Sequence, residues 1–250
     1  MSEGFDYGTE EEVAEGLGFK NPVEGEHTAR IRSIIHCGLF RETFQKTKGA
    51  PVELKKPAAQ VVVIFELKDD GDFEDDGITP LTLTKSMPLK AGDKATASIF
   101  RKAIDPAGKL TGFDFFIGLA CQVNCKGSKE KNEDGTPKYI NYGGIAGLAG
   151  GQTGKFAKVT EPLVVEGVGH VPFDKLTKEA ILELQPITHV NRVIMAGEKY
   201  AGSVAEKIIA EIREENPEFA VPATKEDTPD KKPEGAKPEV DPDLDNDKEF

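Results

Sequence analysis

The chain has 250 residues, of which 32 are Lys or Arg and 44 are Asp or Glu, so its formal charge is −12 at pH 7. This balance excludes a uniformly basic nucleic-acid-binding protein, although a basic surface can lie within an acidic total. The absence of a long apolar run or a secretory leader, with only three cysteines, argues against a membrane span, secretion and a disulfide framework.

The charge and the apolar periodicity divide the chain into three parts. Residues 1–25 are acidic and lack sustained periodicity, which predicts a loosely held N-terminal arm. Residues 26–216 hold the periodic segments and are expected to fold as one domain with a helical C-terminal extension. Residues 217–250 contain six prolines, five lysines and eleven acids, so we expect a disordered acidic tail.

The first half of the domain predicts three strands. Residues 27–39 alternate between apolar and polar side chains, which is typical of a half-buried strand whose polar face carries Arg30 and Arg32. Residues 61–65 are apolar on both faces, which predicts a central strand. Alternation resumes at residues 81–84, so the three segments indicate an antiparallel meander.

A helix and two further strands complete the predicted order. Residues 95–104 place apolar side chains at helical spacing, and residues 120–126 and 137–145 are strand candidates. Their connection contains Asp134-Gly135, a turn signal. Three strands, a helix and two strands follow the order of an OB-fold, so we expect a mainly β protein with an OB-fold-like antiparallel five-stranded barrel.

The C-terminal part of the domain is predicted to be helical. A short helix is expected over residues 175–184, where Gln185-Pro186 stops it. A second is expected over residues 203–216, because Ser203 and Glu206 form a capping-box pattern.

The chain offers no specific catalytic or cofactor pattern. Cys121 and Cys125 would lie roughly 13 Å apart on one strand, too far to share a zinc ion, so core packing beside Val123 is the better interpretation. Gly154-Lys155 departs from the phosphate-loop pattern on both sides. The acidic run 69–76 favours a solvated turn over a weak metal site. We therefore expect no catalytic residue, cofactor or metal.

Cations interleave with aromatic residues in two segments of the domain. Residues 27–65 carry seven bases and two acids, and residues 121–160 carry six bases and three acids. Proteins that bind single strands use cations to follow phosphates and rings to stack on bases. The candidate phosphate contacts are Arg30, Arg32, Arg41, Lys126 and Lys138, and the candidate stacking rings are Tyr139 and Tyr142. The two rings point to opposite faces of a regular strand, so only one stacks unless a bulge reorients the other.

The last twelve residues form a second distinctive feature. Residues 239–250 carry six acids and one base and end in an aromatic residue. A terminal ring can fill a pocket while carboxylates meet Arg or Lys of a partner, or the tail can fold back onto its own basic groove. The candidate anchor consists of Asp241, Asp243, Asp245, Asp247, Glu249 and Phe250.

These features resemble a known family. An acidic tail ending in Phe after a barrel-like domain resembles the single-stranded-DNA-binding proteins of bacteria and tailed bacteriophages. The segments 21–27, 113–125 and 139–142 resemble the phage branch, and the similarity covers roughly residues 20–150 and the last ten. It implies an OB-fold that binds and protects single-stranded DNA without sequence preference during phage DNA replication or recombination in the host cytoplasm. It also implies a tail that recruits replication or recombination proteins.

Two points stay open at this level. The helical region 174–216 lies outside a minimal barrel and either caps it or supports a homo-oligomer. The total charge of −12 also suits an acidic adaptor or DNA mimic that binds a host protein, and a virion or assembly protein is a third alternative.

Overall fold

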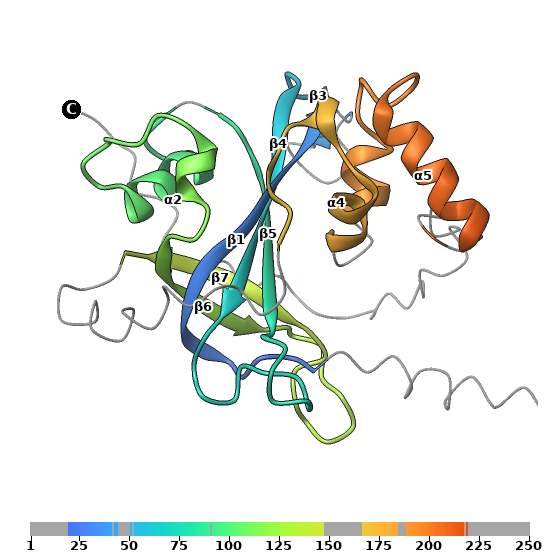
Figure 1. The fold of residues 1–250 in the computed structure, drawn as a ribbon. Helices are drawn as coiled ribbons and strands as arrows, with labels where there is room; N and C mark the ends of the chain where they lie inside the picture. Colours follow the sequence, from blue (N-terminus) through green and yellow to red (C-terminus); the bar gives the residue numbers. More distant parts are fainter. Residues whose placement is uncertain are drawn as a thin grey trace, which may run out of the picture. The chain divides into compact units, whose positions relative to one another are not determined.

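The computed structural model describes residues 20–41, 43–44, 51, 53–90, 92–147, 167–184, 189–217 and 219. All of them fall within one compact unit that ends at Ala220. They form a curled, mainly antiparallel sheet with helices packed against it, which confirms the predicted fold class (Figure 1). No helix within these ranges is long and apolar enough to cross a bilayer.

Five strands build the curled sheet, which is a half-barrel. Its strand order is β5-β4-β1-β6-β7, and every neighbouring pair is antiparallel. Helix α2, Thr96–Ile104, connects the third strand to the fourth, so the arrangement is compatible with an OB-fold. The strands are β1 Gly25–Phe40, β4 Ala58–Leu67, β5 Thr82–Pro88, β6 Ala120–Gly127 and β7 Ile140–Ala146.

A β-bulge part way along strand β1 changes which face of the sheet its alternating side chains point to. The pairing with β4 shifts between Ile31 and Ser33, and again just before Gly38. Ile31 and Ile34 therefore both pack inside the half-barrel, whereas Ile35 packs on the opposite face. The period-two prediction for this strand is wrong beyond Ile31, since a bulge inserts one extra residue into the alternation.

The first hydrophobic core fills the curl of the sheet. It joins the inner side chains of the five strands to α2 and to the 3-10 helix η1, Phe113–Phe116. Cys121, Val123 and Cys125 form an inward row on β6, each at most 1 % exposed, which confirms the predicted core packing. Burial raises the pKa of both thiols to about 12, so they stay protonated at neutral pH.

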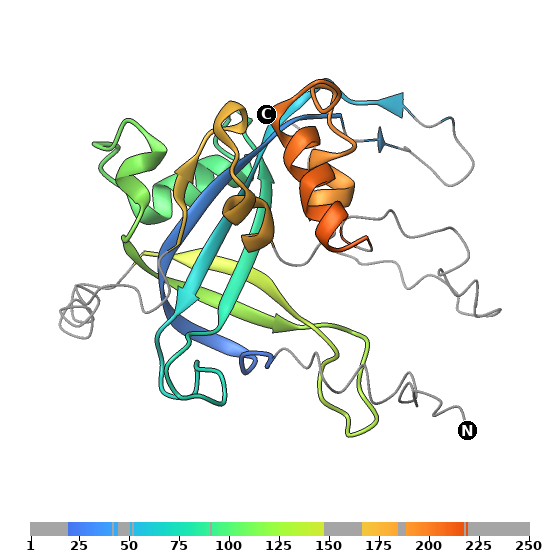
Figure 2. The same cartoon turned by 45° about the vertical axis from the view of Figure 1, so that its right-hand side comes forward.

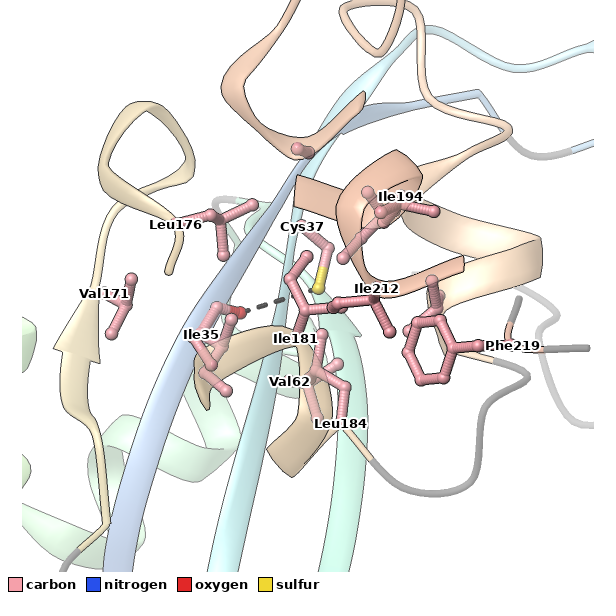
Figure 3. Packing of buried hydrophobic residues seen from close by; sticks show 14 of the residues in the cluster. Ile35, Cys37, Val62, Val171, Leu176, Ile181, Leu184, Ile194, Ile212 and Phe219 are labelled. Atoms are coloured by element: carbon pink, nitrogen blue, oxygen red, sulfur yellow. Dashed lines mark hydrogen bonds between the residues drawn. The ribbon is translucent and has the colours of Figure 1, made fainter. Parts of the chain in front are cut away.

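A second core lies on the other face of β1 and β4. Ile35 and Cys37 of β1 and Val62 of β4 pack there against the C-terminal helices (Figures 2 and 3). Figure 3 also shows the weak hydrogen bond that Cys37 Sγ donates to the Ile35 carbonyl at 3.7 Å. Because the C-terminal helices cover this second face, β1 is buried on both faces. These helices are α4 Lys178–Glu183, the π-helix η4 Val190–Ile194 and α5 Val204–Glu215.

The capping signal at the start of α5 is confirmed. The Ser203 hydroxyl accepts a hydrogen bond from the Glu206 amide at 3.2 Å, and the Glu206 carboxylate accepts one from the Gly202 amide at 2.6 Å. This reciprocal pair satisfies backbone donors that the first helical turn leaves open.

Several short elements were not predicted. Strand β8, Gly169–Val171, pairs in parallel with residues 33–35 of β1, next to the stretch that pairs with β6. The 3-10 helix η3, Phe173–Lys175, follows it. The two-residue strands β2, Thr43–Phe44, and β3, Glu53–Leu54, form a separate small sheet.

Candidate nucleic-acid interface

Two arginines expected to contact phosphate are buried in ion pairs. The Arg30 Nη2 lies 3.0 Å from Glu66 Oε1, and Arg30 is 3 % exposed. The Arg32 Nε lies 2.6 Å from Glu183 Oε1, and Arg32 is 9 % exposed. Their expected place on an exposed polar face is wrong, because β4 and α4 bring these carboxylates onto β1. Both arginines are buried and held by carboxylates, and moving either one to a phosphate would break a buried ion pair, so neither side chain is suited to bind phosphate.

Arg41 is exposed where β1 ends. Its Nε lies 2.7 Å from Glu198 Oε1, and both side chains are well exposed. An exposed ion pair contributes little to stability, so a phosphate can compete with Glu198 for this guanidinium. Arg41 therefore stays a candidate phosphate contact.

The hairpin between β6 and β7 brings together a cation and a ring, as expected. Lys126 and Lys138 are exposed, and Tyr139 is 52 % exposed. The Lys138 Nζ lies 5.4 Å from the centroid of the Tyr139 ring. The Ser128 amide donates to the Tyr139 carbonyl at 2.8 Å, which holds the base of the hairpin. A base can stack on such a ring while the ammonium groups approach the phosphates.

Tyr142 contributes to the barrel seam rather than to an open stacking face. Its ring stacks on Phe65, with centroids 5.8 Å apart and an interplanar angle of 18°. The Lys85 Nζ of β5 lies 5.2 Å from the Tyr142 centroid, so this ring bridges the two edge strands of the half-barrel. Burial raises the Tyr142 pKa to about 12. Only Tyr139 of the two tyrosines is largely exposed.

An aromatic pocket beside α2 was missed by the sequence analysis. It has a volume of about 480 Å³, and its walls include Phe100 of α2 with Phe113 and Phe116 of η1. The ring pairs Phe100–Phe116 and Phe113–Phe116 both have centroids 5.9 Å apart and meet edge to face. Phe115, on the same short helix, is 59 % exposed. The pocket thus has a size and a lining typical of small-ligand sites, with a free ring beside it.

Cations border this pocket. Lys90 and Arg101 line it, and Arg101 Nη2 donates to the Leu110 carbonyl at 2.6 Å. A second hollow of about 450 Å³ lies next to it and shares Arg101. Residues 85–109 carry six bases and two acids, a net charge of +4. The signal that could have revealed this surface is this basic run followed by Phe-Asp-Phe-Phe at residues 113–116.

The acidic loop after β4 differs from a simple solvated turn. Asp72 is 2 % exposed, and its Oδ2 lies 2.8 Å from His27 Nδ1. His27 Nε2 lies 2.7 Å from the Val23 carbonyl oxygen, so both ring nitrogens face acceptors. Oxygens of Asp69 and Asp72 with a nitrogen of His27 come within 4.8 Å of one another, a spacing that could suit a metal ion. Their internal hydrogen bonds already occupy these atoms, which favours a structural role.

The acidic loop also lies close to the hairpin. The Lys20 Nζ lies 3.5 Å from Asp75 Oδ1, and the neighbouring Asn21 donates from Nδ2 to the Lys138 carbonyl at 3.3 Å. Negative charge near the hairpin weakens its attraction for a phosphate chain, whereas the rim of the aromatic pocket is basic. The anchor residues of the C-terminal tail lie outside the described residues.

No protein-family model, curated protein or solved structure matches this chain. Its function is therefore inferred from the geometry of its own residues.

Proposed function

We propose that the protein binds single-stranded DNA without sequence preference, and protects it during phage DNA replication or recombination in the host cytoplasm. The observation that carries this proposal is the aromatic pocket beside α2, whose phenylalanine walls are bordered by Lys90 and Arg101. Rings stack on any base, and cations follow any phosphate chain. Single strands expose their bases for such stacking, whereas a duplex hides them.

The exposed hairpin supplies a second contact of the same kind. Tyr139 offers a ring beside Lys138, and Lys126 lies on the strand that leads into the hairpin. Phe115 provides a further exposed ring near the pocket. Arg30 and Arg32 have no place in this interface, because both are buried against carboxylates. The proposed activity is binding alone, with no catalytic step and no cofactor.

The acidic residues toward the C-terminus complete the proposal. Residues 239–250 would bind replication or recombination proteins through their carboxylates and Phe250. In the absence of DNA these acids would bind the basic rim of the pocket. DNA would then compete with them for the rim, because the acids and the phosphates are both negatively charged.

A direct test is fluorescence anisotropy with a labelled oligo-dT and a matched duplex across a salt series. The whole chain is compared with a version that ends at Ala220 rather than earlier, because Phe219 packs in the second core. We expect preferential single-strand binding that weakens with salt, with a slope of about 0.7 per neutralised phosphate. Removal of the acidic residues should tighten it.

The same experiment distinguishes single-strand binding from the rival function. An acidic adaptor or DNA mimic is favoured by the net charge of −12 and by the burial of two arginines expected to bind DNA. If neither version binds oligo-dT at low salt, single-strand binding is excluded and the adaptor becomes the better proposal.

A further inference from the structure

Two histidines from distant parts of the chain converge at the junction of β1, β8 and η1. His36 lies on β1 and His170 on β8, and their Nε2 atoms are 3.0 Å apart. The parallel pairing of β8 with β1 sets this approach, since His170 is the register partner of Ile34, two residues before His36. The backbone pairing of β8 with β1 therefore holds the two histidines close to each other.

A carboxylate fixes the state of one imidazole. The Asp114 Oδ1 lies 2.8 Å from His170 Nδ1. Because a carboxylate only accepts hydrogen bonds, Nδ1 of His170 carries a proton, and in the neutral form of such a ring the lone pair is at Nε2. That lone pair points at Nε2 of His36, so the two facing nitrogens share one proton. A carboxylate behind a histidine is the arrangement that orients metal-binding imidazoles.

The separation of the two nitrogens matches that of ligands on one ion. Bonds of about 2.05 Å place two nitrogens about 2.9 Å apart at a right angle and about 3.3 Å apart at the tetrahedral angle. The observed 3.0 Å lies between these two values, so one ion can bridge the two nitrogens with a small rotation of the rings. Right angles between neighbouring nitrogen ligands are typical of Cu²⁺ and Ni²⁺, and the tetrahedral angle of Zn²⁺.

The surroundings hold both rings and leave a path for an ion. The Phe113 ring lies 5.4 Å from the His36 ring and 5.7 Å from the His170 ring, centroid to centroid, and so flanks both. His36 is partly buried, the His170 side chain is 15 % exposed and the Asp114 side chain is 76 % exposed. Solvent therefore reaches the pair, and water can fill the remaining coordination positions.

We propose that Nε2 of His36 and Nε2 of His170, with Asp114 behind His170, bind one divalent transition-metal ion, with Cu²⁺ bound most tightly. On binding, the proton between the two nitrogens moves to Nδ1 of His36, so both imidazoles coordinate as neutral ligands and no net proton is lost. The ion would tie β8 to β1, and through Asp114 to η1. This inference does not depend on DNA binding.

The cluster of His27 with Asp69 and Asp72 makes an informative contrast. There the two ring nitrogens meet a carboxylate at 2.8 Å and a backbone carbonyl at 2.7 Å, which are both acceptors. A ring that donates from both nitrogens has no lone pair to offer a metal. The pair of His36 and His170 differs because a nitrogen lone pair faces the second imidazole.

The test is isothermal titration of the untagged full chain with CuCl₂, NiCl₂ or ZnCl₂ in a non-coordinating buffer. We expect one site, with Cu²⁺ bound most tightly, and a raised Tm when the ion is present. His36→Ala and His170→Ala should each weaken this site at least tenfold, and Asp114→Asn should weaken it about tenfold. His189→Gln is the matched control and should leave the affinity unchanged.

Wild-type affinity in either His36→Ala or His170→Ala would overturn the proposal, as would the absence of a site in the wild-type chain. If the variants fail to fold, paramagnetic broadening by Cu²⁺ in the NMR spectrum of the wild-type chain decides the matter. Selective broadening of the His36, Asp114 and His170 signals supports the site. Broadening that starts at His27 or at the acidic C-terminal residues contradicts it.

Discussion

At the scale of single residues, the ionisation of His27 makes the stability of the fold depend on pH near neutrality. Burial alone lowers the His27 pKa, but the hydrogen bond to Asp72, the Val23 carbonyl and the charges of Asp72 and Asp69 together raise it above its ordinary value of 6.5. The folded state therefore keeps a proton that the unfolded state gives up near its ordinary pKa.

The raised pKa of His27 determines how the free energy of unfolding changes with pH. With a raised folded pKa, the His27 contribution is complete below about pH 6.5 and is lost as the pH rises through the folded value. We predict that the free energy of unfolding decreases over that window in the wild-type chain and that His27→Gln removes this decrease. The substitution should also cost about 1–3 kcal/mol at low pH, because the buried Asp72 loses its charged donor and keeps the Asp69 amide at 3.0 Å. Urea unfolding at several pH values measures both effects, and an unchanged pH slope in the variant would contradict them.

His189 should act in the opposite direction. Burial lowers the His189 pKa, and its Nε2 lies 3.3 Å from Thr84 Oγ1. Below about pH 6.5 the unfolded state takes up a proton that the folded state does not, so this group lowers stability as the pH falls. We predict that His189→Gln flattens the acid side of the stability profile and leaves the alkaline side unchanged. Chemical unfolding at mildly acid pH, compared with His27→Gln, separates the two histidines.

At the scale of elements, the second bulge of β1 depends on Gly38. Gly38 has φ +86°, and a Cβ placed there would lie 2.9 Å from Cε2 of the Phe173 ring. Gly135 has a similar φ of +84° but open space around it, so it is a matched control. We predict that Gly135→Ala costs about 1 kcal/mol from backbone strain alone, and that Gly38→Ala costs about 1–3 kcal/mol more. Equal losses of Tm in the two variants would show that Phe173 does not restrict this position.

Local patterns predicted most of these elements, and contacts between distant segments account for the rest. The apolar run 61–65 and the Ser203 capping box each depend on neighbouring residues, and both appear where the sequence places them. The bulge at residues 31–33 and the parallel pairing of β8 depend on partners far along the chain, which alternation alone cannot encode. The predicted polar face of β1 is buried because β4 and α4, which lie far along the chain, bring Glu66 and Glu183 against Arg30 and Arg32.

The candidate site was predictable to the same extent. Lys138 and Tyr139 follow one another in a hairpin, so a local pattern was enough to find them. Arg30 and Arg32 were misjudged, because the acids that bury them come from β4 and from α4. The pocket was missed because Phe100 and Phe113 come together only when α2 and η1 pack.

At the scale of the whole molecule, the uneven charge connects structure and proposed function. Residues 1–26 carry a net charge of −7 and residues 217–250 carry −6, whereas residues 85–109 around the aromatic pocket carry +4. A nucleic acid would thus be attracted to the basic segments between the two acidic ends, and its binding should depend steeply on salt.

The most direct measurement of the central proposal is the affinity of Phe115→Ala for oligo-dT. Phe115 is 59 % exposed, so its loss removes a stacking ring with little effect on the core, and Val204→Ala on α5, 42 % exposed, is the matched control. Stacking contributes about 1–3 kcal/mol per base, so Phe115→Ala should weaken binding about 5- to 150-fold while Val204→Ala leaves it unchanged. Equal affinities of the two variants and the wild-type chain would contradict base stacking on Phe115, the exposed ring of η1 next to the aromatic pocket.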